Sequence, residues 1–181
     1  SAANKIVWLA TVTPGDVVLV DRNCHKSVMH AIIMTGAIPI YLIPTRNEYG
    51  IIGPIQSREF HPEVIAEKIR NSPLIDDPAA ETIKMAVITN STYDGICYST
   101  ERIEEQLRNV VPYLHYDEAW FGYARFHPLY AGRYGMHTTD TVGPTVFATQ
   151  STHKVLAAFS QGSMLHVRQG RGPVDHPRFN E

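Results

Sequence analysis

The feature that most constrains how this chain can fold is the wholly apolar run Val17-Val18-Leu19-Val20. A strand with one face in water alternates apolar and polar side chains, so a run that is apolar on both faces is typical of a strand covered on both sides. Comparable short runs recur at 37–43, 85–89, 113–116, 145–149 and 163–167. The repeated pattern predicts a sheet with both faces covered.

Helical patterns lie between these runs. Asn4–Val12 carries an apolar stripe, and His25–Met34 is a second helical stretch. Pro62 suits the first turn of a helix, and Ser99 suits the N-cap of another. Strands that alternate with helices predict right-handed crossovers and an α/β fold of three layers, in which a mostly parallel sheet has helices on both faces.

Two more local patterns carry predictions. Turn-forming residues such as Asn47 predict a loop over Pro44–Phe60, and Asn71–Glu81 is also expected to be a loop. Glu104 and Arg108 stand four residues apart on a helical stretch, which predicts an ion pair on the helix surface.

Composition excludes several classes of function. The 181 residues hold 16 Lys and Arg against 18 Asp and Glu, a net charge of −2 that argues against binding nucleic acid or an anionic membrane surface. No apolar run approaches the roughly 18–20 residues of a membrane span. With two cysteines, Cys24 and Cys97, and no signal peptide in the first ten residues, a cytoplasmic location is expected. The nine histidines and two cysteines lack metal-site spacing, so no metal is expected. Nucleotide-binding glycine motifs and the hydrolase elbow are missing from the sequence.

In sheets of this kind, ligands bind beyond the carboxyl ends of the strands. Polar residues follow four of the expected strands, at 21–25, 90–95, 117–120 and 151–154. If the strands are parallel, these four segments meet at one edge of the sheet. They are therefore the candidates for a binding site.

Lys154 follows a buried strand within Ser151-Thr152-His153-Lys154. A lysine that loses hydration there favours its neutral amine, which is a nucleophile. The neighbouring hydroxyls and imidazole could hold a phosphate. The alternative is an ordinary helix start capped by Ser151 or Thr152, with Lys154 in solvent.

Asp117 and His25 also stand at strand ends. A carboxylate in the position of Asp117 can face a cationic ring nitrogen, or can simply accept from a helix N-terminus. His25 could stack on a planar cofactor, act as a base or bind a metal, or it could be a polar residue at a helix start. Ser1 precedes a helix, where its hydroxyl and backbone N–H groups could bind phosphate.

Taken in order, five segments resemble one family. They are Ser-Ala-Ala-Asn-Lys at 1–5, Asp-Arg-Asn-Cys-His-Lys-Ser at 21–27, Thr-Asn-Ser-Thr-Tyr-Asp-Gly at 89–95, Tyr-Asp-Glu-Ala-Trp at 116–120 and Thr-Gln-Ser-Thr-His-Lys at 149–154. This order resembles the bacterial ornithine/lysine/arginine decarboxylases, which are fold-type I pyridoxal-phosphate enzymes. Ser-Thr-His-Lys is the most specific element.

The resemblance covers nearly the whole chain but only one part of the family protein. It implies that residues 1–181 belong to the pyridoxal-phosphate-binding large domain, an incomplete aspartate-aminotransferase-like unit without the family's N-terminal wing and C-terminal small domain. The chain has no initiator Met, so we expect it to be a piece of a longer protein that is inactive by itself.

The resemblance also implies roles for single residues. Lys154 matches the lysine that carries pyridoxal phosphate covalently, Asp117 the carboxylate that pairs with the pyridine nitrogen, and His25 the imidazole stacked on the ring. The remaining matches are three groups around the phosphate and two residues near the ring and its hydroxyl: Ser1, Ser151 and His153, then Ala119 and Trp120.

The activity implied for the full-length parent is decarboxylation of lysine, arginine or ornithine to a diamine or agmatine and CO₂. The parent is expected to be a homodimer or a higher oligomer. Two alternatives stay open. One is another fold-type I activity, such as an aminotransferase or aldolase, and the other is a catalytically incompetent structural or interaction module.

Overall fold

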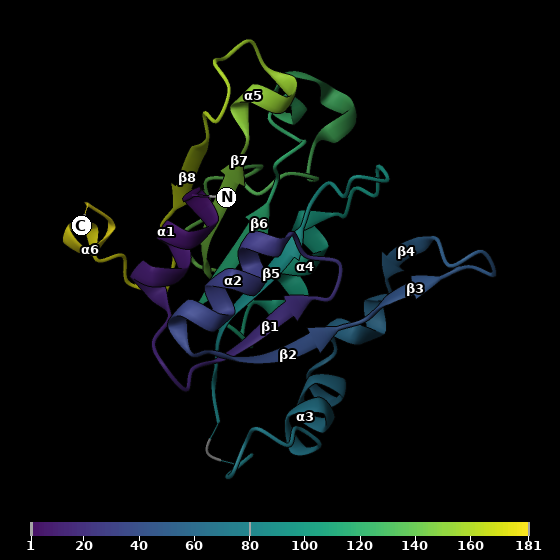
Figure 1. Ribbon diagram of the computed structural model, residues 1–181, viewed down its shortest axis with the longest axis vertical. Coiled ribbons are helices and arrows are strands. Elements are labelled where there is room, and N and C mark those ends of the chain that lie inside the picture. The colour runs from purple at the N-terminus through teal and green to yellow at the C-terminus, as the bar shows by residue number, and fades with distance from the viewer. Residues whose placement is uncertain (1, 80, 181) are drawn as a thin grey trace.

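The computed structural model describes residues 2–79 and 81–180 (Figure 1). Its main feature is a sheet of six strands in the order β2-β1-β5-β6-β7-β8. The first five strands in this order are parallel to their neighbours, whereas β8 runs antiparallel to β7. The prediction of a mostly parallel sheet is therefore confirmed. The strands are β1 (Val17–Asp21), β2 (Ile38–Leu42), β5 (Ile83–Thr89), β6 (Tyr113–Asp117), β7 (Thr145–Gln150) and β8 (Met164–Arg168).

Helices cover both faces of this sheet. On one face lie α1 (Ala2–Thr11), α2 (Lys26–Thr35) and the short α6 (His176–Asn180); on the other lie α3 (Pro62–Arg70) and α4 (Thr100–Leu107). Figure 1 shows α1 and α2 in front of the sheet. The α/β class with helices on both faces is confirmed.

Strand β1 shows why its sequence is apolar throughout. Val18 and Val20 pack in one buried cluster with Trp8 of α1, whereas Val17 and Leu19 pack in another cluster on the opposite face. All five residues of the strand are buried. Burial of each such side chain stabilises the fold by roughly 1.5–3 kcal/mol, so a polar substitution on either face would be costly.

The helix ends follow local chemistry. The Ser99 side chain accepts a hydrogen bond from the backbone N–H of Arg102, so it caps α4 as expected. Gly36 closes α2 with φ of 68° and donates its N–H to the carbonyl of Ile32. His25 is the N-cap of α2 and stands just outside the helix.

The prediction of a loop over Pro44–Phe60 is wrong. This segment forms the antiparallel hairpin of β3 (Pro44–Arg46) and β4 (Ile52–Ile55), followed by the 3₁₀ helix η1 (Ser57–Phe60). The carboxamide oxygen of Asn47 accepts from the N–H groups of Tyr49 and Ile51, so the turn residues connect two strands. The strands pair only with each other among the described residues and are too short to show a clear alternation.

The expected pair between Glu104 and Arg108 is also wrong. Glu104 is buried, and its carboxylate accepts from Arg168 Nη2 at 2.6 Å and lies 3.2 Å from His137 Nε2. Arg108 instead lies 3.5 Å from Asp140. A buried carboxylate requires a buried cation, and this outweighs the few tenths of a kcal/mol of a surface helical pair.

The remaining short elements lie in the connections. Strand β6 is followed by the 3₁₀ helices η2 (Ala124–Phe126) and η3 (Pro128–Tyr130), and β7 by the single helical turn α5 (Thr152–Val155). The described part of Asn71–Glu81 consists of turns and bends, as expected.

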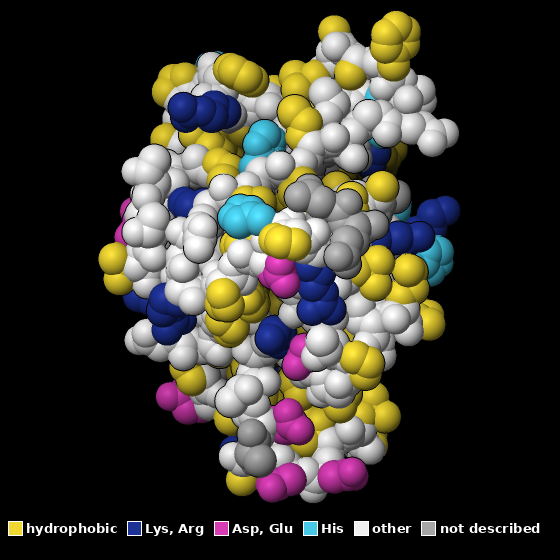
Figure 2. Space-filling view, turned by 90° about the vertical axis from the view of Figure 1, so that its left-hand side faces the viewer, with side chains coloured by type: hydrophobic (Ala, Val, Ile, Leu, Met, Phe, Trp, Pro, Cys, Tyr) yellow, Lys and Arg dark blue, Asp and Glu magenta, His cyan; other side chains and the backbone are white. Residues whose placement is uncertain are grey.

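The surface mixes side chains of different kinds. Figure 2 shows hydrophobic, basic and acidic side chains interspersed on one face, with acidic ones gathered toward its lower end. Within residues 2–79 and 81–180, none of the helices has the length and apolar character needed to cross a membrane.

Candidate functional site

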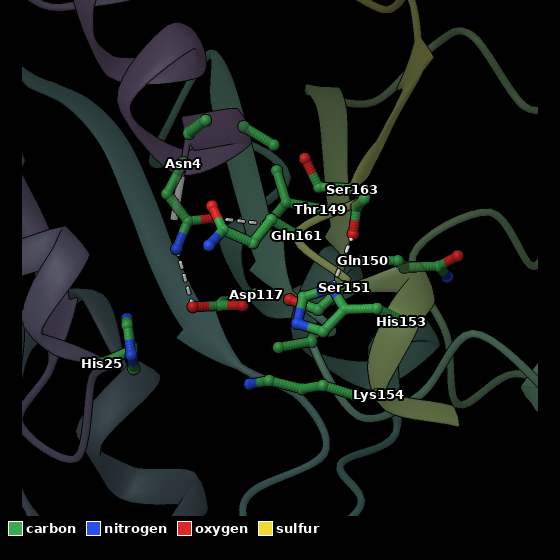
Figure 3. Close-up of a pocket in the computed structure, with 14 residues that line it drawn as sticks. Asn4, His25, Asp117, Thr149, Gln150, Ser151, His153, Lys154, Gln161 and Ser163 are labelled. Atoms are coloured by element: carbon green, nitrogen blue, oxygen red, sulfur yellow. Dashed lines mark hydrogen bonds between the residues drawn. The ribbon is translucent and has the colours of Figure 1, made fainter. Parts of the chain in front are cut away.

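The candidate site is a cavity of about 340 Å³ beyond the carboxyl ends of β6 and β7 (Figure 3). The start of α1 and the N-cap of α2 close it from the other side. The cavity is lined by residues from all of these elements: Asn4, His25, Asp117, Ala119, Thr149, Gln150, Ser151, His153, Lys154, Gln161 and Ser163. A smaller cavity of about 200 Å³ adjoins it, and residues shared by the two include His25, Asp117, Ala119 and Lys154.

The structure thus brings together most of the residues singled out in the sequence. The strand-end segments that hold His25, Asp117 and Lys154 all reach the larger cavity, and the segment at 90–95 reaches the smaller one. Trp120 lines the smaller cavity. Ser1 lies outside the described residues.

Asp117 is the last residue of β6 and is only 4% exposed. Its Oδ2 atom accepts a hydrogen bond from Nδ2 of Asn4 at 2.8 Å. In the sheet it stands level with Thr149 of β7 and Thr89 of β5. A parallel sheet therefore places this carboxylate between two strand ends, where it faces the cavity (Figure 3).

His25 stands opposite on α2 and is exposed. Its Nδ1 accepts from the backbone N–H of Ser27 at 3.2 Å and lies 2.8 Å from Ser27 Oγ. Burial lowers the pKa of His25, the charge of Asp117 acts in the other direction, and that of Lys154 adds to the lowering. This lowering of the pKa favours the neutral form of the imidazole.

Lys154 projects from α5 toward the side on which His25 lies (Figure 3). Its Nζ lies 4.6 Å from the centre of the Trp120 ring, and the side chain is half-buried. Ser151 is the N-cap of α5, but its side chain makes no capping hydrogen bond. The alternative is a helix start capped by Ser151 or Thr152 with Lys154 in solvent. The helix start is present with Ser151 at the N-cap position, but the Ser151 hydroxyl makes no capping bond and Lys154 is half-buried.

The other predicted site residues line the rim and floor. His153 is exposed, and its Nδ1 lies 2.8 Å from the carbonyl oxygen of Gly162, to which it donates. Ala119 is half-buried between the two cavities, where its small side chain leaves room beside Asp117. The Trp120 ring packs edge-on against Tyr93 with ring centres 5.7 Å apart.

Sequence reasoning missed Asn4, which is 2% exposed and binds the predicted carboxylate. A signal was present, because Asn4 is a polar residue on the buried side of α1, beside Ala3 and Val7. An amide in such a stripe is expected to have a hydrogen-bonding partner.

Glu118 was not assigned a role from the sequence. It is completely buried, and its Oε1 accepts from the N–H of Gly135 at 2.6 Å, while Asn90 and Gln150 donate from 3.2 Å. Burial raises the pKa of Glu118 to about 7, against the lowering effect of these donors. Glu118 follows the last residue of β6 and lines neither of the two cavities.

Within residues 2–79 and 81–180, no three His, Cys, Asp or Glu side chains group closely enough to hold a metal ion. The cavity instead offers one amine, one carboxylate, imidazoles and hydroxyls. These groups suit an organic ligand with both a cationic nitrogen and an anionic group.

Known proteins share this sequence and fold. Residues 1–181 match the family model described as "Orn/Lys/Arg decarboxylase, major domain". Over 183 aligned residues the chain is 59% identical to lysine decarboxylase LdcA of Pseudomonas aeruginosa and 50% identical to the biodegradative arginine decarboxylase of Escherichia coli strain K12. The solved structure of lysine decarboxylase A from Pseudomonas aeruginosa superposes with a TM-score of 0.92 over 99% of this chain and 24% of that one.

The same matches set the scale of the chain. All of it aligns with 24% of each of the two curated relatives, so it spans about a quarter of their length. The chain belongs to the Orn/Lys/Arg decarboxylase family, whose major-domain model matches residues 1–181.

Proposed function

We propose that the protein to which these residues belong decarboxylates a basic amino acid (lysine, arginine or ornithine) with pyridoxal phosphate, yielding a diamine or agmatine and CO₂. The observation that carries this proposal is the meeting of the Lys154 amine, the Asp117 carboxylate and the His25 imidazole at one cavity. The names of the relatives, a lysine and an arginine decarboxylase, support the substrate class.

The residues present fit pyridoxal phosphate chemically. An amine is needed for its aldehyde, a carboxylate for its ring nitrogen and hydrogen-bond donors for its phosphate. Lys154, Asp117 and the Ser151 hydroxyl supply these groups at the same cavity, which His153 also lines. The small side chain of Ala119 leaves space there for a flat ring.

When bound, pyridoxal phosphate supplies an electron sink for the electron pair left on the α-carbon as CO₂ departs. The Lys154 amine would hold the cofactor through its aldehyde carbon. Asp117 holds a proton on the ring nitrogen, because a nearby carboxylate favours the cationic form of that nitrogen. The imidazole of His25, which lines the same cavity, would stack on the cofactor ring and limit its contact with water.

Assembly and location are part of the same proposal. We propose a homodimer or higher oligomer, supported by the exposed aromatic side chains of Trp120, Tyr123 and Phe126 after β6. The free thiols of Cys24 and Cys97 support a reducing compartment such as the cytoplasm.

The experiment uses the full-length protein purified from its host. We expect a visible absorption band from bound cofactor, and borohydride reduction should leave the cofactor on Lys154 in a mapped peptide. Lysine, arginine and ornithine are then supplied separately while CO₂ release is measured. Lys154→Ala should abolish both the label and CO₂ release.

Lys84→Ala is the matched control. Lys84 stands at the start of β5, over the ring of Tyr113, and far along the strand from the carboxyl-end cavity. It should retain the label and the activity. A label on another residue, or transamination without CO₂ release, would contradict the proposal and favour the aminotransferase alternative.

A further inference from the structure

Asn4 is a buried amide at the centre of a hydrogen-bond network that crosses the molecule. It belongs to α1, yet its side chain contacts Asp117 of β6, Thr149 of β7 and Ser27 of α2. We propose that Asn4 is a positioning residue: it fixes the orientation of the Asp117 carboxylate toward the cofactor ring nitrogen and, through Ser27, the proton position on His25. This inference rests on the proposed function.

The direction of each proton follows from Asp117. An ionised carboxylate only accepts hydrogen bonds, so the NH₂ group of Asn4 must face it, at 2.8 Å from Oδ2. The same NH₂ group donates its second proton to Ser27 Oγ at 2.9 Å. Both donors of the amide are therefore used.

The amide oxygen of Asn4 must then accept, and Thr149 Oγ1 donates to it at 2.6 Å. The single hydroxyl proton of Thr149 is thereby used, so His115 Nε2, at 3.0 Å, must donate to Thr149 Oγ1. This leaves Nδ1 of His115 without a proton. Nδ1 is a buried atom that has no hydrogen-bonding partner among the described residues. Burial lowers the pKa of His115 to about 4, which agrees with a neutral ring.

The second arm runs to His25. Ser27 Oγ accepts from Asn4 and therefore directs its own proton to His25 Nδ1, 2.8 Å away. The backbone N–H of Ser27 donates to the same atom at 3.2 Å. Two donors on Nδ1 leave the proton of the neutral imidazole on Nε2.

The consequence for the site is an oriented carboxylate. Among residues 2–79 and 81–180, the one hydrogen bond to the Asp117 side chain comes from Asn4 and reaches Oδ2, so Oδ1 is left for a ligand. Without Asn4 the carboxylate can turn, and it loses a charge-assisted hydrogen bond. Its pairing with a cationic ring nitrogen should weaken, while contacts with the rest of the cofactor remain.

The test compares two ligands of the apo form of the full-length protein. One is pyridoxal phosphate, and the other is its carbocyclic analogue, in which a C–H replaces the ring nitrogen. Dissociation constants are measured at equilibrium for the wild type and for Asn4→Ala. We expect Asn4→Ala to weaken pyridoxal phosphate binding by about 10–100-fold, the range typical when a partner behind a binding group is removed. The dissociation constant of the analogue should change far less, so the ratio between the two dissociation constants should move toward one.

Thr35→Ala is the control, because Thr35 is also a buried polar side chain but lies at the end of α2 away from the cavity, where its hydroxyl donates to the carbonyl of Ala31 at 2.8 Å. It should keep the wild-type preference between the two ligands. If Asn4→Ala fails to fold, Thr149→Val and Thr149→Ser replace it. The valine variant removes the hydroxyl that donates to Asn4 and should reduce the preference for pyridoxal phosphate over the analogue. The serine variant keeps the hydroxyl and should keep the preference.

The outcomes separate the two proposals. In one outcome the wild type prefers pyridoxal phosphate, but Asn4→Ala weakens the binding of both ligands equally or of neither. That result would overturn the role of Asn4 and leave the proposed function standing. Wild-type protein that binds the two ligands equally would overturn both, because Asp117 would then not pair with the ring nitrogen.

Discussion

Lys154 and Trp120 are in direct contact: the ammonium nitrogen lies 4.6 Å from the centre of the indole ring. Such a cation–π contact contributes about 0.5–1 kcal/mol at a partly exposed site. The indole restricts the lysine side chain, and it borders the smaller cavity beside Asp117. The pair therefore connects the proposed attachment point of the cofactor to the wall of its cavity.

The first prediction concerns this pair. Trp120→Ala in the full-length protein removes an aromatic wall of the smaller cavity and should weaken cofactor binding by about two- to tenfold, the factor that corresponds to the roughly 0.5–1.5 kcal/mol of an aromatic pair. Trp120→Phe keeps an aromatic face and should bind nearly as well as the wild type. The measurement is the equilibrium dissociation constant of pyridoxal phosphate, and equal constants for the alanine variant and the wild type would contradict the prediction.

The second prediction concerns Asp117. Asp117→Asn keeps the shape of the side chain but removes its charge, so the ring nitrogen loses the group that holds its proton. We expect kcat for decarboxylation to fall by about 10²–10³-fold, the size typical of a lost electrostatic group. Asp77→Asn, at an exposed turn, is the control and should keep the wild-type kcat. A fall of less than threefold in Asp117→Asn would refute the assigned role.

The third prediction concerns the buried ion pair of Glu104 and Arg168, whose residues are 8% and 7% exposed. Arg168→Met leaves the Glu104 carboxylate buried without its cation, which should lower the free energy of unfolding by about 3–5 kcal/mol. Replacing both residues together, as Glu104→Leu with Arg168→Met, should recover most of the loss. Urea denaturation of the full-length protein measures both changes.

The control for this pair is Arg108→Met. Arg108 forms an exposed ion pair with Asp140, and solvent screening leaves such pairs with little effect on stability. If Arg108→Met costs as much as Arg168→Met, burial is not what makes the Glu104 pair important.

The fourth prediction concerns pH. Burial raises the pKa of Glu118 from 4.5 to about 7, so the folded state binds the proton more tightly than the unfolded state. The contribution of Glu118 to stability is therefore complete below about pH 4.5 and is lost as the pH rises through about 7. The glutamine in Glu118→Gln cannot titrate. The denaturation midpoint of this variant should therefore not show the fall that Glu118 causes in the wild type between about pH 4.5 and 7.

Comparing the wild type with Glu118→Gln also separates the contribution of Glu118 to the pH dependence of stability from that of His115. Burial lowers the pKa of His115 to about 4, so its contribution to stability is complete above 6.5 and is lost as the pH falls through about 4. His115 is present in both proteins, so subtracting the stability of Glu118→Gln from that of the wild type cancels the His115 contribution. Glu63→Gln, on the exposed side of α3, is the matched control; an equal change in both variants would show that Glu118 is not the group responsible.

Local patterns predicted the parts of the fold that depend on a few neighbouring residues. The run at Val17–Val20 indicated a strand buried on both faces, and Ser99 indicated the start of α4. The hairpin within Pro44–Phe60 was missed because its strands of three and four residues are too short for a period to appear. The partner of Glu104 was missed because it is 64 residues away.

The sequence by itself determined the α/β alternation and the places of His25, Asp117 and Lys154 at strand ends. Apolar runs and strand boundaries depend on residues that are adjacent in the chain, so they can be recognised locally. Only the tertiary structure decided which side chains meet. Asn4 is separated from Asp117 by 113 positions and from Thr149 by 145, and their contacts depend on strand order, register and the docking of α1. Those relations are set by packing of the whole chain, which places donors and acceptors within 3 Å where no local pattern relates them.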